Sequence, residues 1–247
     1  MLKPTHSTLP DQTMSLKIQE LNITLFAKDL KPGTIHPAVL QYLGIIPAQW
    51  ELTENPVYSE RELKLVFTNQ VRLLVQPNRI IFAETVGSKK PQDVQISHIT
   101  AAYLRAFSNI NYQAVSIAPS GYVPFNSNRE AGAYMSENFL PSRPWKTFAD
   151  RAVNAVGLKL AYPYKAGNFY LEINQANLDI GDRSIPAIWF AGNFNYQFEN
   201  KDATERLAYL QTIIRQWQVD VNEFGNFISQ KFLGTTKASE VSVFPVQ

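Results

Sequence analysis

The chain has 247 residues, of which 45% are hydrophobic, and a formal net charge of +2 from 23 basic and 21 acidic side chains. It has no cysteine, which excludes disulfides and thiolate chemistry, and it lacks the stripe of Lys and Arg that is typical of nucleic-acid and membrane-surface binders. No run reaches the roughly 18 apolar residues that a membrane-spanning helix needs, and we expect a cytoplasmic protein.

The N-terminal segment, residues 1–14, is polar and contains two prolines, which predicts a loose arm. It has no apolar stretch of the kind that a secretory signal needs. Met14 offers a second start, in which case residues 1–13 would precede the real beginning of the protein.

The first half, residues 15–125, alternates between strand and helix patterns. Strands are expected at 21–26, 63–67, 71–76, 79–86 and 114–118. A short helix is expected after Pro37, and a longer amphipathic helix over 94–110 with Asp93 as its N-cap. The turn chemistry of Pro119-Ser120-Gly121 is expected to end the last of these strands.

Residues 126–144 lack periodicity and are rich in Asn, Ser, Gly and Pro, which predicts a long loop between two halves. Arg129, Tyr134 and Arg143 lie in this loop and Trp145 follows it. Arginine and aromatic residues are enriched at binding hot spots, so we predict that these four residues contact a ligand or partner. The alternative is a linker whose aromatic side chains pin it to the globule.

The second half, residues 145–247, is expected to begin with a short helix near 145–152. Strands follow at 157–162, 169–173 and 187–198, and the alternating run at 239–247 predicts one more. Between them a long helix is expected over 202–232, with Asp202 and Glu205 resembling a capping box at its start.

The strand at 187–198 has two different faces. Its apolar residues share one face, and Trp189, Asn193, Asn195 and Gln197 share the other. The pattern predicts one buried and one wet face. The wet face, with Trp189 as a predicted contact residue, either lines a groove for a polar ligand or is an ordinary solvated sheet surface.

The long helix carries apolar residues at steps of three and four. They are Leu207, Leu210, Ile214, Trp217, Val221, Phe224 and Ile228. This is the spacing of a coiled-coil seam, which suits a homodimer. Ile213 and Phe227 broaden the stripe, and that favours packing of the helix on a sheet.

Two runs suggest an internal duplication. Residues 79–83 (RIIFA) and 187–191 (AIWFA) align at an offset of 108, and the same offset places Leu63 on Leu171. The runs VSIAP and VSVFP follow the two predicted helices. The repeated unit would read strand, strand, strand, helix, strand, with the two halves packed as one globule.

Acid–base chemistry has one candidate, Glu84, which shares a strand face with Ile80 and Phe82. A carboxylate on an apolar face has a raised pKa, which is one route to a catalytic acid. The alternatives are that Glu84 is wet at a frayed strand end or that it pairs with Arg72 across a hairpin. The histidines have no metal-ligand spacing, and no phosphate loop is present, so we predict no catalytic residue, metal site or cofactor.

The sequence therefore predicts an α+β protein with antiparallel sheets flanked by helices. The favoured function is a non-catalytic interaction or assembly module, with an unknown protein or a second copy as partner. The alternative is a small-molecule-binding protein or a carboxylate-dependent enzyme with its ligand between the halves. Nucleic acid is a weaker alternative, in which Trp189 or Tyr170 on a sheet would stack on bases.

Overall fold

The computed structural model describes residues 14–234 except 88, 142–143, 181 and 199–201. Of the predicted N-terminal arm, only Met14 falls in the described part. The predicted strand at 239–247 and the predicted contact residue Arg143 lie outside the described residues.

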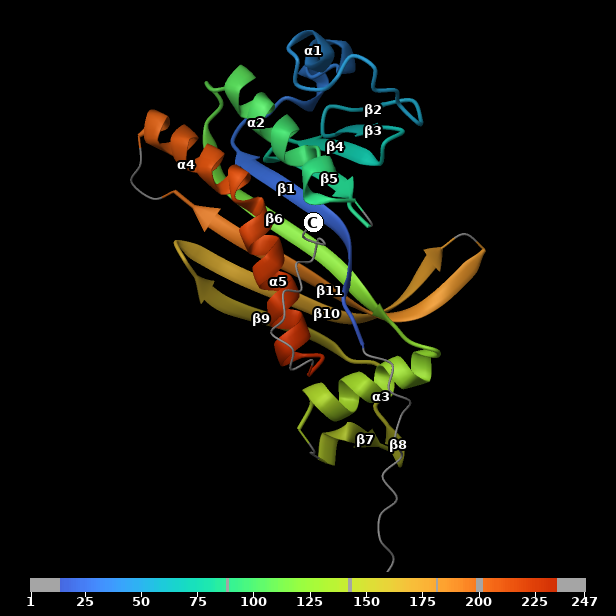
Figure 1. The fold of residues 1–247 in the computed structure, drawn as a ribbon. Helices are drawn as coiled ribbons and strands as arrows, with labels where there is room; N and C mark the ends of the chain where they lie inside the picture. The colour runs from blue at the N-terminus through green and yellow to red at the C-terminus, as the bar shows by residue number, and fades with distance from the viewer. Residues whose placement is uncertain (1–13, 88, 142–143, 181, 199–201, 235–247) are drawn as a thin grey trace, which may run out of the picture.

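One nine-stranded antiparallel sheet forms the centre of the protein, in the order β2-β3-β4-β5-β1-β6-β11-β10-β9 (Figure 1). Its strands are β1 (Lys17–Ala27), β2 (Val57–Tyr58), β3 (Leu63–Val66), β4 (Val71–Gln76), β5 (Arg79–Thr85), β6 (Tyr112–Pro124), β9 (Gly157–Tyr164), β10 (Gly167–Ile180) and β11 (Arg183–Gln197). A separate hairpin pairs β7 (Thr147–Phe148) with β8 (Arg151–Ala152).

Five α-helices accompany the sheet in the described part of the chain. They are α1 (Pro37–Tyr42), α2 (Ile96–Ala106), α3 (Asn128–Phe139), α4 (Ala203–Arg215) and α5 (Trp217–Lys231), with short 3-10 turns at Pro32–Thr34, Pro91–Asp93 and Pro144–Lys146. The predicted α+β class is confirmed. None of the helices in these residues has the length and apolar character required to cross a membrane.

The strand order is mirrored about the central pair β1 and β6. The meander β3-β4-β5 lies beside β1, and the meander β9-β10-β11 lies beside β6. Each meander is followed by a helix, α2 after β5 and α4 after β11. Strands from both predicted halves therefore belong to one continuous sheet.

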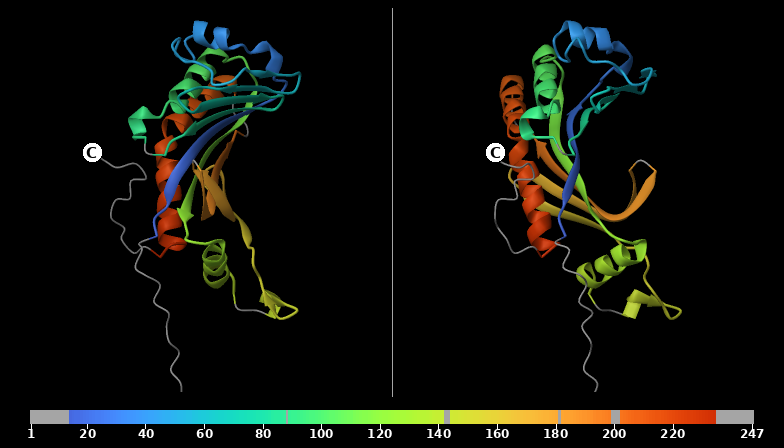
Figure 2. Two further views of the ribbon diagram at one scale, coloured as in Figure 1. Left: turned by 90° about the vertical axis from the view of Figure 1, so that its right-hand side faces the viewer. Right: turned by 45° about the vertical axis from the view of Figure 1, so that its right-hand side comes forward.

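Helices α2, α4 and α5 cover one face of the sheet (Figures 1 and 2). On β11, Ile188, Phe190, Phe194 and Tyr196 point to this face and are at most 1% exposed, as their alternation predicts. The helix stripe meets them: six of its seven residues, all except the half-buried Leu207, are buried. Packing on a sheet is thus confirmed, and the stripe is not free to form a dimer seam.

The predicted long helix over 202–232 is divided. Asp202 caps its start, accepting the Glu205 N–H at 2.9 Å, but Gln216 leaves the helical conformation and separates α4 from α5. On a straight helix, an apolar stripe with a strict seven-residue repeat moves around the helix axis by about 20° per heptad. The interruption between Ile214 and Trp217 lets both parts of the stripe face the sheet.

The predicted loop at 126–144 is wrong, because it contains the three-turn helix α3. Ser127 Oγ accepts the Glu130 N–H at 3.2 Å, and the Glu130 carboxylate accepts the Asn126 N–H at 3.3 Å. This reciprocal arrangement resembles a capping box, whose S-x-x-E signature is present at Ser127. The helix predicted near 145–152 is also wrong, since a 3-10 turn and the β7–β8 hairpin occupy that segment.

The expected strand end at Pro119-Ser120-Gly121 is wrong as well, because β6 continues through it to Pro124. Gly121 permits this: a Cβ at that position would lie 2.5 Å from the backbone oxygen of Lys17 on β1. β1 compensates with one extra residue between Ile18 and Glu20, a β-bulge. The central strands are therefore long enough to support both meanders.

A buried acid, Asp220, joins α5 to the outer strands. Its side chain is 3% exposed and accepts hydrogen bonds from the Tyr196 hydroxyl at 2.8 Å, Lys165 Nζ at 3.1 Å and the Tyr164 hydroxyl at 3.3 Å. Burial, followed by the bonds to Asp220, raises the pKa of Tyr196. The cluster fixes α5 against β9 and β11.

We predict that Asp220→Ala lowers the free energy of unfolding by about 3 kcal/mol, because it leaves Tyr196 and Lys165 without their acceptor. Chemical denaturation measures the loss. Asp220→Asn keeps one acceptor and should cost less. The control Val219→Ala, on the exposed side of the same helix, should stay within about 0.5 kcal/mol. An Asp220→Ala loss as small as the control would contradict a structural role for the cluster.

Buried tyrosines predict sensitivity to alkali. Burial raises the pKa of Tyr103, Tyr112 and Tyr196 from the ordinary value of 10.0. Above that pH the unfolded chain loses tyrosine protons that the folded chain keeps, so stability falls as the pH rises. Denaturation at a series of pH values should show this slope, and Tyr103→Phe should reduce it. The exposed-site control Tyr42→Phe should not, and a slope unaffected by Tyr103→Phe would contradict the explanation.

Candidate functional site

The face of the sheet opposite α2, α4 and α5 carries no helix in the described part of the chain, and we call it the open face. It is concave, and the far end of the β10–β11 hairpin curls toward it (Figure 2). Curvature shields its small residues: Thr24, Ala83, Ser116 and Ser120 are only 2–7% exposed. The open face is therefore a shaped surface.

Strand register arranges polar side chains in rows across the open face. Thr24 on β1, Ser116 on β6, Asn195 on β11 and Asn168 on β10 occupy successive paired positions. One step along, Asn193 is paired with Tyr170. The rows consist of uncharged hydrogen-bonding groups, which suit a ligand that offers both donors and acceptors.

A hollow of about 430 Å³ lies in the first-half part of the open face and reaches β11. We call it the central hollow. It is lined by Asn22, Thr24, Phe26, Lys64, Arg72, Leu73, Leu74, Arg79, Ile81, Ala83, Ser116, Ala118 and Asn193. The described lining residues combine amide, hydroxyl and cationic groups with apolar patches and include no carboxylate.

Three cations border the central hollow, and two of them are neutralised by carboxylates. Arg72 forms an ion pair with Glu20, and Lys64 Nζ lies 3.0 Å from Glu54 Oε1. Arg79 Nε instead donates to the neutral amide oxygen of Gln76 at 2.6 Å. Arg79 is thus the cation best placed to meet a carboxylate from outside.

Two amide side chains on the open face are incompletely satisfied. The Oδ1 atoms of Asn193 and Asn195 are buried and have no hydrogen-bond partner among the described residues. A buried acceptor without a partner costs roughly 1–3 kcal/mol. A bound molecule with N–H groups would relieve this cost once the side chains turn toward it.

The predicted contact residues are not brought together. Trp189 lies on the open face, paired with Tyr122. Tyr134 donates its hydroxyl to the Phe232 backbone oxygen at 2.7 Å and packs on Phe125, so it anchors α3 to the globule. Arg129 is exposed on α3, and Trp145 is 58% exposed in the turn after α3.

Glu84 points away from the open face and is fully buried. Its carboxylate lies 2.9 Å from Lys89 Nζ and accepts the backbone N–H groups of Gln95 at 2.7 Å and Ile96 at 3.0 Å. It is neither wet nor paired with Arg72, and both of those expectations are wrong. Glu84, and not the predicted Asp93, satisfies the N-terminal turn of α2, where a negative charge is favoured.

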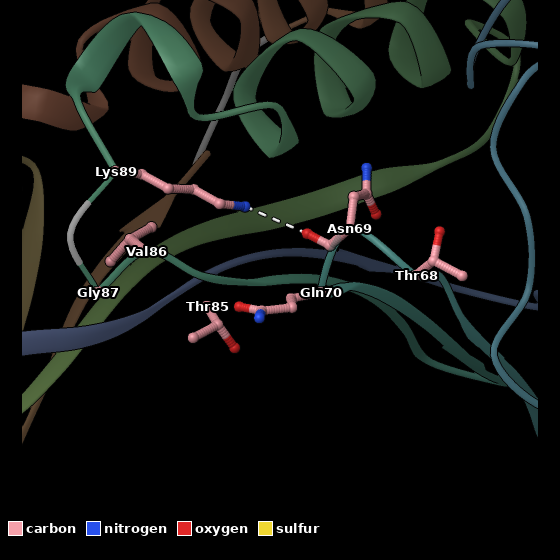
Figure 3. Close-up of a pocket in the computed structure, with 7 residues that line it drawn as sticks. All are labelled: Thr68, Asn69, Gln70, Thr85, Val86, Gly87 and Lys89. Atoms are coloured by element: carbon pink, nitrogen blue, oxygen red, sulfur yellow. Dashed lines mark hydrogen bonds between the residues drawn. The ribbon is translucent and has the colours of Figure 1, made fainter.

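A second depression, of about 440 Å³, adjoins this ion pair (Figure 3). Lys89 reaches across it and donates to the Asn69 backbone oxygen at 3.2 Å. The remaining lining residues are Thr68, Gln70, Thr85, Val86 and Gly87. Among the described lining residues the one charged side chain is that of Lys89, and it is committed to Glu84 and Asn69, so none of them offers a free charge to an anion.

Within the described ranges, no three His, Cys, Asp or Glu residues gather as metal ligands do. No protein-family model matches the chain, and no curated protein matches it.

Sequence reasoning missed the central hollow, although its signal was present. Alternation in the predicted strands 71–76 and 79–86 places Arg72 and Leu74 on one face together with Arg79 and Ile81. The pattern does not predict that β5 pairs with β1, because at least 52 residues separate the paired positions. This pairing brings Thr24 opposite Ile81.

We predict that Glu84→Gln lowers the free energy of unfolding by at least about 2 kcal/mol, since it removes charge-assisted bonds to Lys89 and to the start of α2. Chemical denaturation provides the value. The matched control is Glu172→Gln, whose ion pair with Lys159 is exposed and should contribute less than about 1 kcal/mol. A Glu84→Gln protein more stable than the parent would instead favour an acid held under strain for catalysis.

Proposed function

We propose that the protein is a non-catalytic binding module whose open face receives a segment of a polypeptide partner. The observation that carries the proposal is the concave, uncovered sheet face with its central hollow of about 430 Å³. Its mixture of amides, hydroxyls and apolar side chains matches a polypeptide, which presents N–H and C=O groups together with apolar side chains.

The shape of the face favours a polypeptide over a small molecule. Small-molecule sites bury most of the ligand surface in a cleft. The open face extends over the strands from β3 to β10 and is not enclosed as a cleft is. An extended ligand therefore covers more of it than a small molecule does. We infer that the partner places a carboxylate opposite Arg79 and apolar groups against Phe26 and Ile81.

The charge pattern disfavours nucleic acid. Binding to a phosphate backbone depends on cations that are free to replace counterions. On the open face Arg72, Lys64 and Lys159 each have a carboxylate partner. A surface on which most of these cations are neutralised, with Arg79 as the exception, suits a polypeptide better than a polyanion.

The distribution of acids disfavours the alternative of a carboxylate-dependent enzyme. Acid–base catalysis by a carboxylate needs that group within hydrogen-bond reach of the ligand. None of the described residues that line the central hollow is a carboxylate, and Glu84 is buried on the opposite side of the sheet.

We also infer that the open face arose by duplication of a unit that begins with a central strand. β1 followed by β3-β4-β5 and α2 would be one copy, and β6 followed by β9-β10-β11 and α4 the other. The mirrored strand order supports this unit. It differs from the unit expected from the sequence, in which β6 was the last strand of the first copy. The expected alignment also matched Leu63 with Leu171, but Leu63 lies on β3, the first strand of its meander, and Leu171 lies on β10, the second strand of its own.

We predict that a photo-crosslinking amino acid at Tyr170, which is 42% exposed on the open face, captures a polypeptide in the cells that make this protein. The same amino acid at Val219, 51% exposed on the helix side, should capture none. Ala118→Arg fills the central hollow and should abolish the adduct. With the captured partner purified, Ala118→Arg should raise Kd at least about tenfold, or about 1.4 kcal/mol.

Three outcomes would count against the proposal. The first is a nucleic-acid adduct at Tyr170, and the second is equal capture of the polypeptide at Tyr170 and at Val219. The third is capture that persists in the Ala118→Arg variant, provided that this variant unfolds at the same denaturant concentration as the parent. Capture of a second copy of the chain at Tyr170 would make the partner the protein itself.

A further inference from the structure

A second hollow, of about 460 Å³, lies between α1 and the β2–β3 edge of the sheet, and we call it the aromatic hollow. Its lining is His36, Pro37, Ala38, Gln41, Trp50, Leu52, Pro56, Tyr58 and Phe67. Four of these nine residues have aromatic rings and two are prolines. The aromatic hollow lies at the edge of the sheet and shares no lining residue with the central hollow.

The rings of the aromatic hollow are held in place by neighbours. Phe67 is 2% exposed and lies under Trp50, with ring centroids 5.3 Å apart. His36 and Tyr58 stack at 6.0 Å with their planes 12° apart. Gln41 fixes the loop that carries Trp50 by donating to the Trp50 backbone oxygen at 3.4 Å. The hollow therefore requires little ordering when a ligand binds.

The polar groups of the lining leave mainly donors for a ligand. His36 Nδ1 accepts the Ala38 N–H, and the Gln41 amide donates to backbone oxygens. Because His36 Nδ1 accepts, the proton of the neutral ring lies on Nε2 and is available to a ligand. Among the described residues, the Tyr58 hydroxyl and the Trp50 indole N–H have no hydrogen-bond partner. A fitting ligand thus presents acceptors and apolar rings, and few donors.

A proline-rich peptide meets these requirements. Proline has no N–H, so its segments offer carbonyl acceptors without donors to satisfy, and their polyproline II conformation is formed before binding. Aromatic-lined grooves are the surfaces that recognise such segments.

Charge selects the flanks of the peptide. Residues 50–62, four of which line the aromatic hollow, contain four Glu and one Arg, and of the four Glu only Glu54 is paired with a cation among the described residues, Lys64. Basic residues beside the prolines would complement this acidic segment and would raise the rate of association.

We propose that the aromatic hollow is a docking site for a proline-rich peptide with basic flanking residues. The prolines pack on Trp50 and Tyr58, whose indole N–H and hydroxyl donate to peptide carbonyl oxygens. This site is independent of the open face and of the function proposed for it.

The test uses a dye-labelled, arginine-flanked oligoproline peptide and the full chain, with binding followed by fluorescence anisotropy. We expect saturable binding that Tyr58→Ala weakens at least about tenfold. Tyr58→Phe, which keeps the ring, should weaken it less. The matched control Tyr42→Ala, at a tyrosine 89% exposed on α1 outside the lining, should bind as the parent does.

Peptide variants test the chemistry of recognition. Replacing the flanking arginines by aspartates should weaken binding, and replacing the prolines by alanines should abolish it. The proposal is overturned if the parent protein shows no saturable binding, or if Tyr58→Ala binds as tightly as Tyr42→Ala. Ala118→Arg should leave peptide binding unchanged, so failure here is distinguishable from failure of the open-face proposal.

Discussion

The structure depends on the pairing of β1 with β6, because this antiparallel pair joins two meanders into a single sheet. Along both strands the side chains alternate between the covered and the open face, so one register fixes the environment of every neighbouring strand. A shift by one residue would expose Ile23 and Ile117 and bury Thr24 and Ser116. The β-bulge at β1 and the close approach at Gly121 preserve this register over long strands.

Helix packing on one face leaves the other face free to be polar. Two buried acids reinforce the packing, since Glu84 holds the start of α2 and Asp220 holds α5, and both lie on the covered side. Neither acid can then serve chemistry on the open face. In the described part of the chain, both buried acids connect a helix to its surroundings through hydrogen bonds.

Local patterns were sufficient where a single element determined the outcome. The alternation of Ile188 and Phe190 with Trp189 identified the buried face of β11, and the spacing of Leu210, Ile214 and Trp217 identified the contact between helix and sheet. The pattern failed for α3, whose capping residues Ser127 and Glu130 were outweighed by nearby Gly and Pro. It also failed at Pro119, where turn chemistry yields to the pairing of β6 on both sides. The hollows combine residues distant in sequence, so no local pattern contains them.

The large buried side chains and the two hollows proposed as binding sites lie on different surfaces of the protein. The covered face holds the large buried side chains, whereas the central hollow is floored by small ones such as Ser116 and Ala118. Substitutions of those small residues change shape and charge where little apolar area is buried, so we expect them to affect folding little. The aromatic hollow follows the same logic at the sheet edge, where Phe67 is buried in the core and Tyr58 remains exposed above it.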